Sequence, residues 1–174
     1  EEDRRADTLG WQVAVRALLC ALVWFPAVQA HDRQPPPAAV GGDLGETTFP
    51  NSGAATAQPD FMRGLLLLHS FEFDTARASF RAAIDKDPGF VMAYWGEALS
   101  YNMPIWGEQD LLAARAVLAR LAPTREERLA KAPTERERLY LAAVEDLYGD
   151  GDKVDRDAAY NEAMGELARK HPDD

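Results

Sequence analysis

This chain of 174 residues has few side chains that are typical of catalytic or metal sites. It contains one cysteine, Cys20, and three histidines, His31, His69 and His171. A single thiol forms no disulfide within the chain, and three histidines far apart in the sequence do not define a firm metal site. The sequence has no H-E-x-x-H, no G-x-S-x-G, no P-loop and no dinucleotide-binding motif. It therefore predicts no catalytic residue, no metal and no cofactor, and it favours a binding protein over an enzyme.

Positive charge is also scarce. Lysine and arginine number 19 against 29 aspartates and glutamates, which gives a formal net charge of -10. Nucleic acid is an unfavourable partner, because its phosphates would be repelled by this surplus of carboxylates. A protein partner with a basic surface is the more natural complement.

The sequence has no apolar run long enough to span a membrane. Its longest candidate lies in Arg16 to Ala30, where about ten apolar residues precede a proline and the small residues of Val28-Gln29-Ala30. A bilayer span needs roughly 20 apolar residues. Residues 1–30 are therefore predicted to be upstream residues plus a secretory signal peptide that leaves with Cys20. We expect an exported bacterial protein, periplasmic or extracellular, with no stable membrane insertion after cleavage.

The composition changes twice along the remaining chain. Residues 31–56 are rich in proline, glycine and alanine and poor in large apolar side chains, which predicts a flexible, disordered linker. From residue 57 to the end, apolar residues recur with helical spacing. The sequence does not begin with methionine, and the helical pattern continues to Asp174, so we expect a fragment with further repeats beyond it.

Six main helical segments follow from this spacing and from stop signals such as Asp87-Pro88. Two near-copies, APTREER and APTERER, each place a threonine three residues before a glutamate, at Thr124 with Glu127 and Thr134 with Glu137. Both predict a reciprocal capping box, the first opening a short connector and the second a long helix. The predicted helices cover 57–70, 74–86, 89–101, 108–121, 134–148 and the stretch between a turn at 149–152 and Lys170.

A set of small and aromatic residues marks the first two helices as a packed pair. Gly64 would let two antiparallel helices approach, and Ala76 would lie opposite it. Phe80 and Ala83 would pack on the next pair, and Pro88 would end the unit. The five positions are Gly64, Ala76, Phe80, Ala83 and Pro88.

The same spacing recurs 34 residues later, where Gly64 corresponds to Ala98. Tyr94, Ala98 and Tyr101 then stand at aromatic, small and aromatic positions of a second unit. The stretch NMPIWGEQD adds residues after this unit and breaks the phase, and the third pair keeps only its helix-turn-helix pattern. Over residues 57–174 the chain resembles the tetratricopeptide repeat family. The resemblance implies an all-α fold of about three antiparallel helix pairs stacked as a right-handed α-solenoid.

In that family the first helix of each pair lines a concave groove. The resemblance, together with helical spacing, places an apolar and aromatic set with two polar members in this groove. The eight residues are Phe61, Leu65, Leu68, His69, Met92, Trp95, Leu99 and Asn102. Such a groove suits a peptide or protein segment anchored by large side chains. The alternative, equally open from the sequence, is that a neighbouring segment of the same chain, such as the linker, fills the groove.

The sequence therefore predicts an exported scaffold that binds a protein or peptide partner, with His69 and Asn102 fixing its orientation. An alternative is that these repeats are the accessory part of a larger enzyme or metal-handling protein whose chemistry lies outside residues 1–174. A third possibility is self-association through the face of the last repeat.

Overall fold

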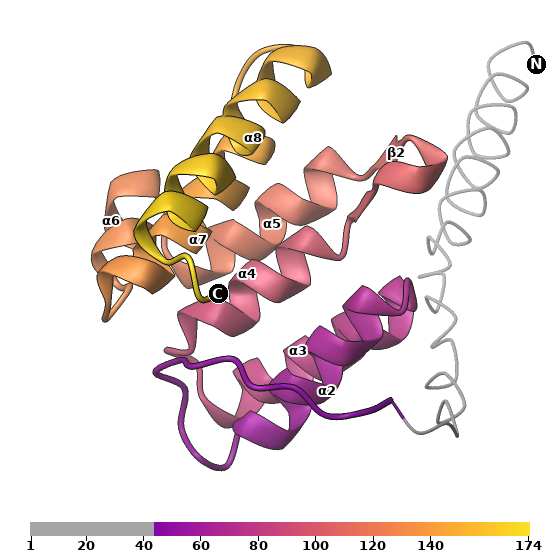
Figure 1. Ribbon diagram of the computed structural model, residues 1–174, viewed down its shortest axis with the longest axis vertical. Helices are drawn as coiled ribbons and strands as arrows, with labels where there is room; N and C mark the ends of the chain where they lie inside the picture. The colour runs from indigo at the N-terminus through magenta and orange to yellow at the C-terminus, as the bar shows by residue number, and fades with distance from the viewer. Residues whose placement is uncertain (1–43) are drawn as a thin grey trace, which may run out of the picture. The chain divides into compact units, whose positions relative to one another are not determined.

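The computed structural model describes residues 44–174, and most of these residues are helical (Figure 1). The predicted signal peptide and the first part of the predicted linker lie outside the described residues. The elements are α2 (Gln58–His69), α3 (Phe73–Lys86), α4 (Val91–Leu99), β1 (Asn102–Met103), the 3-10 turn η1 (Pro104–Trp106), β2 (Glu108–Gln109), α5 (Leu111–Leu121), α6 (Arg125–Ala130), α7 (Glu135–Leu147) and α8 (Lys153–Lys170).

The prediction of an all-α fold is confirmed, since each predicted segment contains a helix. One difference concerns NMPIWGEQD, in which Asn102 pairs with Gln109 and Met103 with Glu108 in a two-residue antiparallel ladder. The intervening 3-10 turn closes at Gly107, whose φ of 69° lies in the left-handed region that glycine adopts without strain. The residues that break the repeat phase therefore form a small hairpin between α4 and α5.

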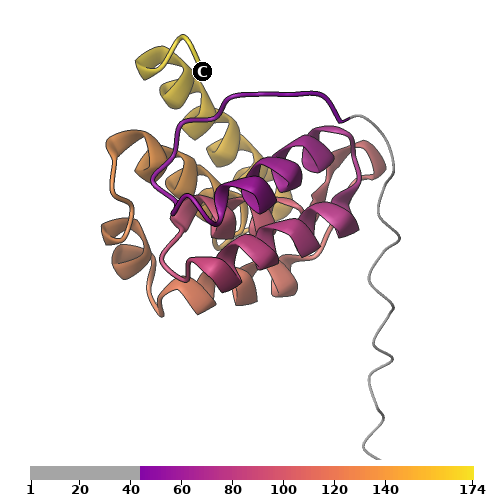
Figure 2. The same cartoon turned by 90° about the horizontal axis from the view of Figure 1, so that it is seen from below.

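Most helices that follow one another along the chain pack side by side. α2 lies against α3, α4 against α5, and α7 against α8, while α3 also contacts α4 (Figures 1 and 2). α4 additionally packs on α7, and the short α6 packs on α7. α4 is therefore the central helix of residues 44–174. None of the helices in this described part is long and apolar enough to cross a lipid bilayer.

The ring of Phe80 explains the close approach of α2, α3 and α4. A Cβ atom built on Gly64 would lie 2.9 Å from this ring, and one built on Gly96 would lie 2.4 Å from it. Both separations are shorter than real Cβ contacts, so a glycine is needed on each side of the ring. We expected Ala76 to receive Gly64, whereas the group found against Gly64 is Phe80; Ala76 and Ala83 are both buried beside it in the core.

A buried carboxylate joins the same central helix to its neighbours. The side chain of Glu97 in α4 is 0% exposed, and it accepts hydrogen bonds from Arg81 of α3 at 2.6 Å and from Arg120 of α5 at 2.8 Å. An unpaired carboxylate at this depth would be strongly unfavourable. Two guanidinium groups on adjacent helices satisfy it, and in doing so they link three successive helices.

The two predicted capping boxes differ in the structure. Thr124 and Glu127 form the complete reciprocal box at the start of α6, as predicted. At the start of α7, Thr134 accepts a hydrogen bond from the Glu137 N–H group, but the Glu137 carboxylate binds Ser52, so the second box is only half formed. The prediction of a reciprocal box there was wrong because a distant segment supplies a competing donor.

Replacement of glycine by alanine should have opposite effects on stability at positions 96 and 165. Gly96→Ala should lower the free energy of unfolding by about 1–3 kcal/mol, because the new methyl group overlaps the Phe80 ring. Gly165→Ala in α8 should raise it by about 0.5–1 kcal/mol, because the nearest atom is 3.6 Å away and alanine favours the helix. Urea denaturation followed by circular dichroism measures both variants, and equal effects at the two positions would contradict the packing described here.

Candidate functional site

The eight residues of the predicted groove fall into two groups in the structure. Four of them, Phe61 and Leu65 on α2 and Met92 and Trp95 on α4, are at most 5% exposed. These four do not line an open groove. The other four, Leu68, His69, Leu99 and Asn102, are partly buried or exposed and lie together around a pocket.

The buried half of the groove is covered at Phe61 and Trp95 by residues 44–56, which we call the covering segment. Its Phe49 ring stacks on Trp95 with 5.9 Å between centroids and 12° between planes. The same ring lies 5.7 Å from Phe61 and 5.4 Å from Tyr140 of α7. Separations of this size are typical of direct aromatic contact. The open alternative, that the chain fills its own groove, therefore holds for this half.

Polar contacts fasten the covering segment to α7. Ser52 donates from its N–H and its hydroxyl group to the Glu137 carboxylate at 2.7 and 2.9 Å. Arg136 donates to the Pro50 carbonyl at 2.6 Å, and its guanidinium lies 4.3 Å from the centre of the Phe49 ring. The prediction of a disordered linker over 31–56 is therefore wrong for residues 44–56. The average composition of that stretch conceals one aromatic anchor and three backbone groups with distant partners, the Pro50 carbonyl and the N–H groups of Ser52 and Ala54.

The C-terminal residue joins this cluster. Asp174 accepts hydrogen bonds from Arg136 and from the Tyr140 hydroxyl group at 3.2 Å. Burial raises the pKa of the Tyr140 phenol to about 12, and the Asp174 carboxylate acts in the same direction. The phenol is therefore a neutral hydrogen-bond donor at physiological pH.

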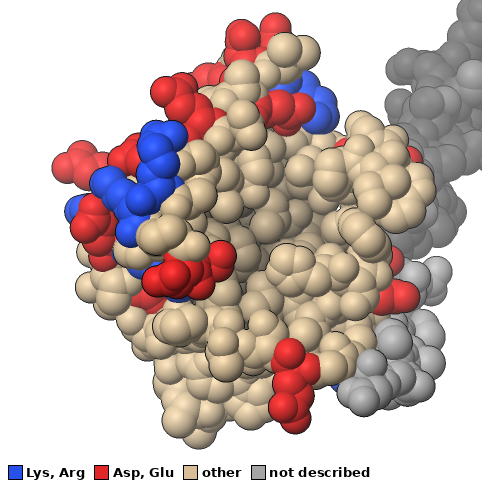
Figure 3. All heavy atoms as spheres, viewed as in Figure 1, with Lys and Arg blue, Asp and Glu red and all other residues tan. Residues whose placement is uncertain are grey.

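The other half of the groove is a pocket of about 390 Å³, which we call the end pocket. It lies where the last turns of α2, α4 and α7 meet the hairpin and the first turns of α8. Figure 3 shows this face hollowed and largely free of charged side chains in its middle, with charged groups towards its edges. The pocket is lined by Leu68, His69, Phe71, Phe73, Leu99, Asn102, Pro104, Leu147, Lys153, Asp157 and Tyr160.

The polar groups of the end pocket are few. Lys153 and Asp157 neutralise each other in an ion pair on α8. The Asn102 side chain accepts a hydrogen bond from Gln109 at 3.3 Å, and burial raises the pKa of the Tyr160 phenol, so that it stays uncharged. His69 is exposed at the end of α2. An apolar wall with a few polar groups is suited to burying an apolar side chain of a ligand and orienting its backbone.

Phe71, Phe73 and Trp106 at the edge of this pocket were not predicted as site residues. Their rings contact one another, with centroids 6.0–6.5 Å apart. Trp106 belongs to the hairpin, which the sequence indicated only as a break in the repeat phase. The sequence did contain one indication that Phe71 is unusual. Glycine is the common residue just after the end of a helix, and a phenylalanine stands there instead.

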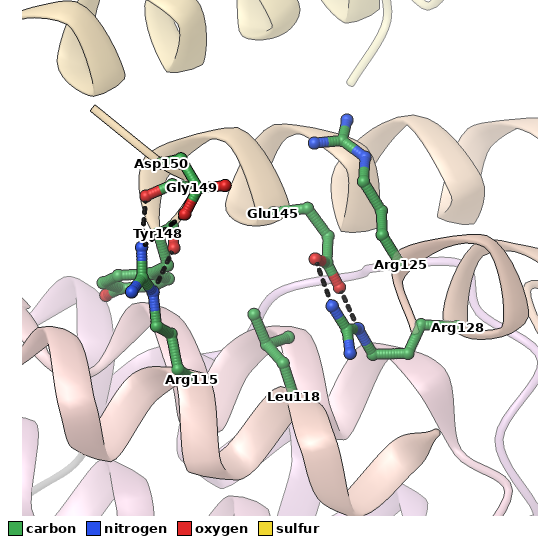
Figure 4. A pocket seen from close by; sticks show the side chains of 8 residues that line it. All are labelled: Arg115, Leu118, Arg125, Arg128, Glu145, Tyr148, Gly149 and Asp150. Atoms are coloured by element: carbon green, nitrogen blue, oxygen red, sulfur yellow. Dashed lines mark hydrogen bonds and ion pairs between the residues drawn. The ribbon is translucent and has the colours of Figure 1, made fainter. Parts of the chain in front are cut away.

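A second pocket, of about 370 Å³, carries three arginines but is structural (Figure 4). Arg115 donates to the carbonyl groups of Tyr148 and Gly149, and Arg128 forms a two-pronged pair with Glu145. Arg125 pairs with Asp146. Since each guanidinium already has an acceptor, the arginines tie α5 and α6 to α7 and are not arranged to receive an anion.

Within residues 44–174, no cluster of three or more histidine, cysteine, aspartate or glutamate side chains is placed to hold a metal ion. Comparison of the chain with protein-family models, with characterised proteins and with solved structures gave no match. The candidate site therefore rests on the geometry of the described residues.

Replacing the anchor of the covering segment provides a test of its role. Phe49→Ala should lower the free energy of unfolding by about 1–3 kcal/mol, because it removes the partly buried ring that contacts Phe61, Trp95 and Tyr140. The neighbouring exposed variant Thr48→Ala should leave the stability within about 0.5 kcal/mol of the unchanged protein. Equal urea midpoints for Phe49→Ala and Thr48→Ala would show that the covering segment does not contribute to the fold.

Proposed function

We propose that this protein is a non-catalytic interaction scaffold of the tetratricopeptide type, and that it binds an apolar side chain of a protein or peptide partner in the end pocket. The observation that carries the proposal is the division of one helical face. Half of it is already filled by an extended segment of the chain, and the other half is an open apolar pocket. An open apolar pocket with a few polar groups is the common form of a binding site.

The repeat assignment is supported by the order of the helices. Two antiparallel pairs, α2 with α3 and α4 with α5, are followed by α7 with α8. The 34-residue spacing from Gly64 to Ala98 relates the first helices of the first two pairs. We propose that the pairs stack as in a right-handed α-solenoid, with the hairpin at 102–109 as an insertion within the second pair.

The covering segment serves as a template for the mode of binding. It crosses the helices without regular secondary structure, inserts one phenylalanine between aromatic side chains and receives hydrogen bonds at its backbone. A partner segment in the end pocket would use the same elements, namely an apolar anchor in the pocket and backbone contacts to Asn102 and His69.

The sequence supports a proposal for the partner and its location. The net charge of -10 favours a partner with a basic surface around its apolar anchor. The signal-like stretch between Arg16 and Ala30 supports export, so the proposed partner is a protein or peptide of the bacterial periplasm or of the extracellular space.

A substitution in the floor of the end pocket tests the proposal. Peptides selected on the full chain from a random-sequence display library should bind Leu99→Glu at least roughly tenfold more weakly, because the new carboxylate would be buried against the ligand's apolar anchor. Leu112→Glu is the matched control, since Leu112 lies outside the pocket and is 79% exposed. Affinity is measured by isothermal titration calorimetry and helicity by circular dichroism. If no peptide is selected, or if the selected peptides bind Leu99→Glu and Leu112→Glu equally, the end pocket is not the binding site.

A further inference from the structure

Phe71 has a backbone conformation that its residue type disfavours. Its φ is 62°, and within residues 44–174 it is the one residue other than glycine with a positive φ. It follows Ser70, the C-cap of α2. Its N–H group bonds to the Leu68 carbonyl at 3.1 Å, and the N–H group of Glu72 bonds to the Leu67 carbonyl at 2.9 Å. Glycine fits this position without strain, whereas a side chain with a Cβ atom costs free energy there. The fold alone therefore favours glycine at position 71.

Burial does not compensate for this strain. Phe71 is 52% exposed; of its two aromatic neighbours, Trp106 is 59% exposed and Phe73 is 9% exposed. The two rings meet edge to face at 6.5 Å, and Trp106 meets Phe73 in the same manner at 6.0 Å. Strained residues that the fold does not need are concentrated at binding sites. Exposed aromatic rings that gather beside an apolar pocket are also typical of interaction surfaces.

The geometry of the three rings restricts what they can bind. Centroid separations of 6.0–6.5 Å are contact distances, so no ligand group fits between the rings. The rings therefore form a wall, which we call the aromatic rim. Phe71 and Phe73 line the end pocket, and Trp106 supports them from the hairpin. A ligand would contact the rim from the pocket side, with an apolar group of its own.

Two exposed carboxylates accompany the rim. Glu72 stands between Phe71 and Phe73, and Glu108 follows Trp106 by two residues. Within the described part of the chain, neither side chain forms an ion pair, whereas Lys153 and Asp157 in the pocket neutralise each other. The carboxylates beside the rim are therefore available to a cation of the ligand.

We infer that the aromatic rim makes the end pocket selective for a peptide segment in which a large apolar residue is flanked by lysine or arginine. The apolar side chain enters the pocket against Phe71 and Phe73, and the flanking cations pair with Glu72 and Glu108. This inference rests on the proposed function and specifies its ligand. A second copy of the chain and an anionic membrane fit less well, because each would bring further negative charge to the same carboxylates.

Three short peptides test this selectivity on the full chain. The probes are Gly-Lys-Phe-Lys-Gly, Gly-Glu-Phe-Glu-Gly and Gly-Lys-Ala-Lys-Gly, each blocked at both ends and titrated while the amide NMR spectrum is recorded. We expect the first probe to bind at least roughly tenfold more tightly than either of the others. Equal affinities for the lysine and glutamate peptides, or no binding of the first peptide, would overturn the inference.

The variant Phe71→Gly separates binding from folding. It should raise the melting temperature, because it relieves the backbone strain, and it should weaken binding of the first peptide by roughly tenfold. Leu112→Ala, which changes an exposed leucine outside the pocket, should alter neither the affinity nor the fold. Unchanged affinity in Phe71→Gly would refute the role of the rim.

The remaining outcomes distinguish a peptide from a second copy of the chain and from a membrane as the ligand of the aromatic rim. If the first peptide binds Phe71→Gly normally but does not bind Leu99→Glu, the rim inference fails while the proposed function stands. If both variants bind it normally, both proposals fail. A concentration-dependent dimer, or binding to vesicles of anionic phospholipid, that is abolished by Trp106→Ala would assign the rim to a second copy or to a membrane and would overturn the inference.

Discussion

Three consecutive residues of α4 face three different neighbours, and the arrangement of the other helices depends on them. Gly96 admits the ring of Phe80, which also fills the space at Gly64. Trp95 stacks on Phe49 of the covering segment, and Glu97 binds Arg81 and Arg120 on the flanking helices. Successive residues of an α-helix point about 100° apart, so a single turn can contact three sides of a core. Close approach is possible on one of these sides only because residue 96 has no side chain.

Four arginines donate hydrogen bonds to carbonyl groups at the ends of neighbouring helices. Arg77 donates to the Ser100 carbonyl at the end of α4, and Arg128 donates to the Ala122 carbonyl at the end of α5. Arg115 and Arg156 do the same at the end of α7, through Tyr148 and Leu147. Cations at these positions satisfy free carbonyl groups and the negative end of the helix dipole. These four cations are thus used inside the fold, whereas Glu72 and Glu108 are exposed.

One face of the helices holds both the covering segment and the end pocket. The covering segment keeps Phe61 and Trp95 out of water, so the stability of this half does not depend on a partner. The end pocket has no such cover within residues 44–174, and Phe71, at a positive φ, places an aromatic ring at its edge. Under the proposed function, stability and binding belong to neighbouring parts of the same surface, and glycine at position 71 would favour the first at the expense of the second.

The sequence by itself determined the helices, because their signals are local. Apolar spacing, Pro88 and the Thr124–Glu127 box each act over a few residues, and the close approach at Gly64 was visible as part of a repeated pattern. The sequence also placed Leu68, His69, Leu99 and Asn102 on one face. Tertiary structure alone decided which half of that face is open. The Phe49 stack and the bond from Ser52 to Glu137 join residues that are far apart in the chain, and no periodicity records such contacts. The same holds for Phe71 and Trp106, which become neighbours only when α2 and the hairpin after α4 reach the same end of the fold.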